Sequence, residues 1–141
     1  MENILILFVS TLAGVVTYYI SVNLNKGAVF GSAIVTLVSG LLFPNIFPSI
    51  GAKLAIVATC ASYAGMVAVK NVPKLWEMAI VSFITGGLYI ATTSAYVGVG
   101  GKLGTIAAIA CFSWIGCKKM LSLLKVNKKE KAYKRELIDQ H

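Results

Sequence analysis

The chain has 141 residues, of which 57% are hydrophobic and only 13% are charged, and 13 lysines and arginines stand against 5 acidic residues. In soluble domains about a quarter of the residues are charged. The composition of this chain therefore excludes a two-domain soluble enzyme and a disulfide scaffold. Seven charged residues lie within residues 1–117, whereas residues 118–141 hold eleven, eight of them basic. The sequence therefore predicts an integral membrane protein with a basic tail. Its net charge of +8 is attributed to membrane topology and not to nucleic-acid binding.

The apolar residues fall into five stretches, and a membrane-spanning helix takes about 20 such residues. We predict spans at residues 4–22, 27–43, 54–69, 75–96 and 103–117. The first stretch is interpreted as a span and not as a signal peptide, because Glu2 precedes it in place of basic residues and no small-residue cleavage pattern follows. Pro44 and Asn45 predict a firm end to the second helix, since Pro48 and Gly51 follow closely.

The predicted fold class is all-α, a polytopic membrane helix bundle of five spans. We assign residues 1–124 to the transmembrane domain and residues 125–141 to a basic cytoplasmic tail. Basic residues orient a membrane protein because they stay on the cytoplasmic side. Three loop lysines and the whole tail fall on one side, whereas Glu2, Lys53 and Lys102 fall on the other. The sequence thus predicts a multi-pass protein of the plasma (inner) membrane, with its N-terminus outside and its C-terminus cytoplasmic.

An internal repeat is visible as three blocks in the same order. Residues 33–43 resemble residues 79–89, Gly51-Ala-Lys-Leu54 resembles Gly100-Gly-Lys-Leu103, and residues 60–65 resemble residues 111–116. We predict one extra N-terminal helix followed by two tandem, parallel helix-loop-helix repeats, at about residues 27–70 and 75–119. Two spans in each repeat make both copies cross in the same direction, as in some transporters whose sites lie between the repeats. A duplication that merely built a larger helical bundle is the alternative.

The repeated Gly-x-Lys-Leu motif places a lysine at the start of the third and the fifth spans. A helix N-terminus carries unpaired N–H groups and a partial positive charge, and glycine lets a ligand approach the backbone. A lysine added there predicts an anion site, formed once by Gly51 and Lys53 and again by Gly100, Gly101 and Lys102. The alternative is that each lysine is an interfacial anchor whose stem extends out of the membrane.

Three further polar residues complete the candidate substrate-binding set: Asn45, Ser62 and Ser113. Asn45 lies in the proline-containing loop before the third span. Ser62 and Ser113 occupy equivalent positions in the two repeats, and they form the best-matched pair for a hydroxyl-lined pathway. Small residues at helical spacing have a second explanation, because they let helices pack closely in lipid.

Neither a catalytic site, nor a cofactor, nor a metal site is predicted. Cys60, Cys111 and Cys117 lack neighbouring histidines or acids, and a metal site needs more ligands than these. We interpret them as small packing residues. The single histidine is His141, and no nucleophile–base or carboxylate pair is available for catalysis. We expect the chain not to be an enzyme.

These features favour a small transporter or channel for a small solute, with its site at the interface between the repeats. The two lysines favour an anionic solute. The short chain predicts a homo-oligomer or a membrane-protein partner. The other expected partners are the lipid bilayer and, for the tail, anionic lipid head groups, while nucleic acid is not expected. Two alternatives stay open. One is a non-catalytic structural subunit of a larger membrane complex, and the other is a holin-like pore-former, which has little need for an ordered repeat.

Overall fold

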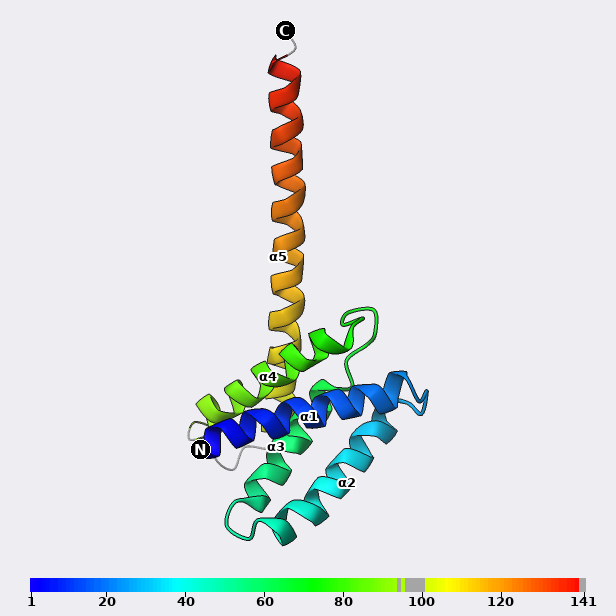
Figure 1. Ribbon diagram of the computed structural model, residues 1–141, viewed down its shortest axis with the longest axis vertical. Helices are drawn as coiled ribbons and strands as arrows, with labels where there is room; N and C mark the ends of the chain where they lie inside the picture. Colours follow the sequence, from blue (N-terminus) through cyan, green and yellow to red (C-terminus); the bar gives the residue numbers. More distant parts are fainter. Residues whose placement is uncertain (94, 96–100, 140–141) are drawn as a thin grey trace. The chain divides into compact units, whose positions relative to one another are not determined.

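The computed structural model describes residues 1–93, 95 and 101–139, with side chains as far as residue 126, and these residues contain helices and no strand (Figure 1). The five helices are α1 (Glu2–Val22), α2 (Ala28–Ile46), α3 (Gly51–Ala64), α4 (Leu75–Thr92) and α5 (Lys102–Asp139). The predicted all-α class is confirmed. Within the described residues, four helical segments are long and apolar enough to cross a membrane: α1, α2, α4 and residues Lys102–Val126 of α5.

The third helix is shorter than the sequence predicts. It has 14 residues, so it is about 21 Å long, less than the roughly 30 Å of a hydrocarbon core. The predicted span reaches residue 69, but α3 ends at Ala64 and the chain turns from Gly65. The turning segment is held against α1, because the Tyr18 hydroxyl donates a hydrogen bond to the Val72 carbonyl. The count of five spans therefore stays a prediction.

The predicted end of the second helix at Pro44 is wrong, since α2 continues through Pro44 to Ile46. Pro44 lies in the last turn, where its missing N–H leaves the Gly40 carbonyl without its helical donor. The side-chain amide of Asn45 donates to the Leu41 carbonyl at 2.8 Å, and the Phe47 N–H donates to the Phe43 carbonyl at 2.9 Å, so other carbonyls of the last turns remain bonded.

The fourth helix ends four residues before its predicted limit, at Thr92. The hydroxyls of Thr92 and Thr93 donate to the carbonyls of Leu88 and Tyr89, both at 2.7 Å. Hydroxyls that bond to the backbone in this way compete with regular helix propagation. Residue 96, the predicted end, lies outside the described residues.

The fifth helix continues from the last predicted span into the basic tail, and it runs to Asp139. The chain divides into two compact units, Met1–Cys111 and Phe112–His141. The second unit is the remainder of α5. Its described part exposes large apolar side chains around the helix: Phe112, Met120, Leu121, Leu123, Leu124 and Val126.

Within the first unit, α1 packs against α2, α3 and α4, and α3 packs against α1, α2 and α4. The core around them consists of apolar residues from all five helices: Ile6, Val9, Ala13, Val35, Leu54, Val57, Ala58, Cys60, Ala61, Tyr89 and Ile106. The extra N-terminal helix of the predicted repeat pattern and α3 thus together join the helices of the bundle.

Helices α1 and α4 lie side by side and run in opposite directions, with small residues where they meet (Figure 1). Ser10 of α1 packs against Gly86 of α4, and Ser82 of α4 packs against Gly14 of α1. The Ser10 hydroxyl also donates to the Ser82 carbonyl at 2.7 Å. This Ser-xxx-Gly pattern on both helices lets the two backbones approach closely, which is how helices associate in lipid.

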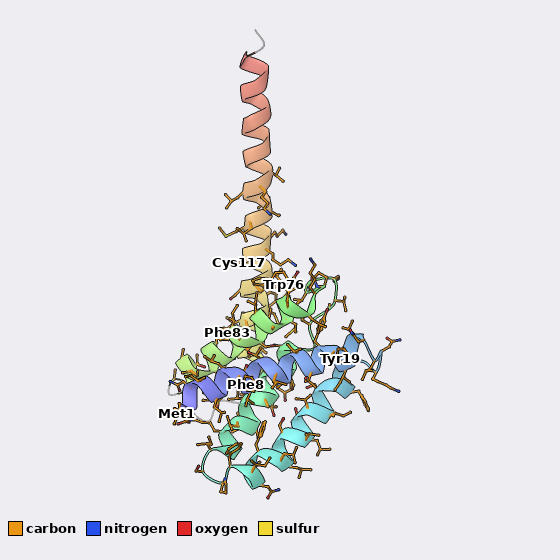
Figure 2. All side chains as sticks on the ribbon, viewed as in Figure 1. Met1, Phe8, Tyr19, Trp76, Phe83 and Cys117 are labelled. Atoms are coloured by element: carbon orange, nitrogen blue, oxygen red, sulfur yellow. The ribbon has the colours of Figure 1, made fainter. Side chains whose placement is uncertain are left out.

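The outer surface of the bundle is apolar. Figure 2 labels Phe8 on α1 and Phe83 on α4, whose side chains are 63% and 54% exposed. Leu37 and Leu41 of α2 are exposed to a similar degree. Large apolar side chains on the outside of a tightly packed bundle are typical of helices surrounded by lipid.

Replacing Gly14 by alanine is expected to destabilise the bundle, because a Cβ there would lie 1.9 Å from the Ser82 Oγ. Overpacking of this kind costs about 1–3 kcal/mol of unfolding free energy. The measurement is thermal unfolding in detergent, followed by circular dichroism. The matched control is Gly87→Ala, because a Cβ at Gly87 meets nothing within 4 Å.

Adding Ser82→Gly to Gly14→Ala should recover most of the lost stability, since it removes the two side-chain atoms nearest to the new methyl group. If Gly14→Ala melts like the wild type, or if the double variant melts no higher than Gly14→Ala, the proposed contact does not determine the packing of α1 on α4.

Candidate functional site

The predicted lysines lie at one end of the first unit, where the starts of α1, α3 and α5 come near the end of α4. Lys53 of α3 donates a hydrogen bond from its ammonium to the Glu2 carboxylate of α1, with 2.6 Å between Nζ and Oε1. The two side chains are 42% and 45% exposed. The hydrogen bond to Glu2 and then its negative charge raise the pKa of Lys53 above its ordinary value. A charge-assisted pair of this length keeps the ammonium charged and oriented.

Lys102, the equivalent lysine of the second repeat, has a different environment. Its Nζ donates to the Thr93 carbonyl at 3.3 Å and lies 5.9 Å from the centre of the Tyr89 ring. That distance is at the outer limit of a cation–π interaction. Among the described side chains, no carboxylate forms an ion pair with Lys102.

Tyr89 lies in the core beside the helix starts that carry the two lysines. Only 6% of its surface is exposed, and it packs in the same core as Leu54 and Leu103, the residues that follow Lys53 and Lys102. We refer to Glu2, Lys53, Tyr89 and Lys102 as the lysine cluster. The structure thus places the two lysines that the sequence singles out at helix starts that share one core. It adds an acid that pairs with Lys53 and an aromatic ring near Lys102, neither of which the sequence predicted for the site.

The glycines of the motif have different surroundings. Gly51 is buried, and a Cβ there would lie 2.1 Å from the Phe43 carbonyl oxygen. Because glycine has no side chain, the end of α2 can pack closely against the start of α3. Gly101 is exposed and has a φ of 80°, a conformation that glycine adopts readily. Gly100 lies outside the described residues.

The other candidates are not part of the lysine cluster. The exposed Asn45 amide bonds to its own helix, as described above. Ser62 is fully buried between α2 and α3, where its hydroxyl lies 2.9 Å from the Ser32 hydroxyl and donates to the Thr59 carbonyl at 2.8 Å. Ser113 is exposed and belongs to the second unit. The two repeat-equivalent serines therefore have unlike environments.

The cysteines of the first unit contact backbone carbonyls. Cys60 of α3 donates to the Leu103 carbonyl of α5 at 3.3 Å, and Cys111 of α5 lies 3.8 Å from the Ala64 carbonyl of α3. Thiols are weak donors, so these contacts fill space more than they fix geometry. Within the part of the chain that the structure describes, no three His, Cys, Asp or Glu side chains are grouped so as to hold a metal ion.

Hollows on the first unit are lined largely by apolar side chains. One of 320 Å³ lies between α1 and α2, beside Leu12 and Val38, and one of 450 Å³ lies between α3 and α5, beside Tyr63 and Ala108. A third, of 540 Å³, is lined by Met1, Glu2, Ile4, Leu5, Phe8 and Ile50. The third hollow is relevant to the site, because the Glu2 side chain that pairs with Lys53 forms part of its wall.

No protein-family model matches this chain, and no curated protein and no solved structure matches it. The function is therefore inferred from the residues themselves, as the fold class alone is compatible with many functions.

Replacing Ser62 by alanine is expected to lower the unfolding free energy by about 1 kcal/mol, because the buried Ser32 hydroxyl loses its partner on α3. Thermal unfolding in detergent measures the change. Ser113→Ala is the control that the repeat provides, since it removes the equivalent hydroxyl from an exposed position and should leave the melting temperature unchanged. Equal effects of the two substitutions contradict a specific α2–α3 contact.

Proposed function

We propose that the protein is a small integral membrane transporter or channel for a small anion, with the lysine cluster as the place where the anion binds. The observation that carries the proposal is that Lys53 and Lys102 lie at helix starts that share one core with the buried Tyr89. Leu54 and Leu103, the residues that follow the two lysines, pack in that core, and Lys102 lies 5.9 Å from the centre of the Tyr89 ring. Two cations and one carboxylate leave the cluster with a positive charge, at the end of a bundle whose helices expose large apolar side chains. Such a charge attracts an anion and steers it to the helix ends.

The proposal places this end of the bundle outside and the basic tail in the cytoplasm, in a plasma (inner) membrane. The support is the distribution of basic residues, since Lys26, Lys70 and Lys74 precede helices that begin at the opposite end from Lys53 and Lys102. The tail would then lie at the cytoplasmic surface, where its lysines attract anionic head groups.

The repeat is part of the same proposal. Cys60 and Cys111 are equivalent in the two sequence repeats, and each contacts the helix that carries the other. The earlier residue of α3 meets the earlier residue of α5, and the later meets the later, so α3 and α5 run in the same direction. Parallel repeats require this course of the two helices.

A path through the membrane would lie between copies of the chain. The described hollows on a single copy are lined mainly by apolar side chains, which hold an ion poorly. A homo-oligomer would bring several lysine clusters around one axis and would cover part of the exposed apolar surface. We propose neither a catalytic role nor a cofactor.

A second candidate is a non-catalytic subunit of a larger membrane complex. It is favoured by the large apolar side chains that α5 exposes between Phe112 and Val126, because a helix of a partner protein would cover them. Native mass spectrometry of the gently solubilised protein separates the two candidates. A defined homo-oligomer supports the transporter or channel, whereas recovery only with unrelated chains favours the subunit.

Lys102→Gln is expected to lower anion uptake about tenfold or more, since a hydrogen bond to a charged group is worth about 1.5–3 kcal/mol. The measurement is the uptake of chloride and of radiolabelled lactate into proteoliposomes. Lys26→Gln is the matched control, because it removes the same charge from the loop between α1 and α2. Circular dichroism shows that both variants are folded. Equal uptake by Lys102→Gln and the wild type overturns the assignment of the anion site.

A further inference from the structure

Glu2 occupies the binding position that Lys53 would offer to a solute. Its Oε1 lies 2.6 Å from the Lys53 Nζ, a distance typical of a direct contact between a carboxylate and an ammonium group. Any small carboxylate that bound to Lys53 would make the same contact with the same atom. The site therefore accommodates a carboxylate, and the protein supplies one from its own chain.

We propose that Glu2 is a tethered competitor, which holds Lys53 in the place of a small carboxylate solute and is displaced when the solute binds. This inference rests on the proposed function, and it adds to it the chemical class of the solute and a group that regulates the site.

The surroundings of Glu2 allow such a displacement. Glu2 is the first residue of α1, and both partners of the pair are nearly half exposed. The side chain also lines the hollow of 540 Å³ beside Leu5, Phe8 and Ile50, so there is space next to the pair. An exposed ion pair contributes little to folding because water screens it, so opening the pair does not require the bundle to unfold.

The charges around the pair favour the replacement of the Glu2 carboxylate by a solute carboxylate at Lys53. After displacement, the Glu2 carboxylate remains at the N-terminus of α1, where the helix dipole and the unpaired N–H groups stabilise a negative charge. The incoming carboxylate gains Lys53, and Lys102, which lies 5.9 Å from the centre of the Tyr89 ring, adds a second positive charge to the lysine cluster. Glu2 therefore lowers the affinity of the site for the solute without abolishing it.

The test uses the full chain in proteoliposomes and radiolabelled lactate as the probe. Glu2→Gln is expected to lower the half-saturating lactate concentration by about two- to fivefold, the range that corresponds to an exposed ion pair. The double variant Glu2→Gln with Lys53→Gln should show no gain over Lys53→Gln alone. Glu130→Gln is the charge-matched control, since it removes one negative charge from the tail, in the second unit.

The outcomes separate this inference from the proposed function. If lactate uptake depends on Lys102 but is the same in Glu2→Gln and the wild type, the competition is overturned and the anion site stands. If chloride is carried and lactate is not, the carboxylate class is overturned. If neither probe is carried by the wild type or by Glu2→Gln, the proposed function fails and this inference fails with it.

A loss of folding in Glu2→Gln is covered by a second variant. Glu2→Asp keeps the charge but shortens the side chain by one methylene, which weakens the contact with Lys53. It should therefore shift the half-saturating concentration in the same direction by a smaller factor. No shift in a folded Glu2→Asp overturns the competition.

Discussion

The rest of the bundle depends on how closely the neighbouring helices approach α1. In lipid there is no hydrophobic force between helices, so close packing and hydrogen bonds must hold them together. A Cβ on Gly65 would lie 2.8 Å from the Gly14 carbonyl oxygen, and one on Gly31 would lie 2.8 Å from the Thr17 carbonyl oxygen. Together with Gly86 on α4, each neighbour of α1 thus contributes a glycine where it meets α1. The lysine cluster depends on these contacts, because they fix where the first residue of α1 meets the start of α3.

Ser82 shows that this packing has a cost in hydrogen bonding. Its carbonyl accepts a bond from Ser10, but its own hydroxyl is buried and has no hydrogen-bond partner among the described residues. A buried polar group without a partner costs about 1–3 kcal/mol. The hydroxyl occupies the space left by the missing side chain of Gly14. The Ser82 hydroxyl therefore contributes to the packing of α4 through van der Waals contact with α1, and not through a hydrogen bond of its own.

The sequence predicts the helices well and their ends poorly, for physical reasons that differ between positions. Hydropathy identifies α1, α2, α4 and the start of α5, because a lipid solvent requires long apolar stretches. Proline at position 44 predicts a helix end, and α2 continues for only two residues beyond Pro44, so the predicted end is misplaced by less than one turn. The early end of α3 depends on a contact between Tyr18 and Val72, which are 54 positions apart. Local composition cannot reveal such a contact.

The candidate site was predictable in part. The repeated motif identifies Lys53 and Lys102, and the distribution of charges places Glu2 on the same side as both. The pairing of Glu2 with Lys53 was therefore within reach of the sequence, as Glu2 is one of only two acids in residues 1–117. The role of Tyr89 was not, because a tyrosine near a helix end is equally typical of an interfacial residue. The four-residue spacing of the small residues Ser10 and Gly14 in the first span is a sequence pattern that indicates close helix packing.

The short α3 determines where irregular backbone lies in the bundle. The Glu2–Lys53 contact shows that the start of α3 lies level with the start of α1, which has 21 residues and is about 31 Å long. The deficit of α3, with 14 residues, therefore falls at its other end. There the turning segment reaches Val72, which is fully buried and accepts the hydrogen bond from Tyr18, a residue one turn inside α1. Non-helical backbone at membrane depth is tolerated where protein covers it. Val72 meets this condition, whereas residues 68–70, 73 and 74 are exposed, so the contact with Tyr18 covers only part of the segment that follows the short α3.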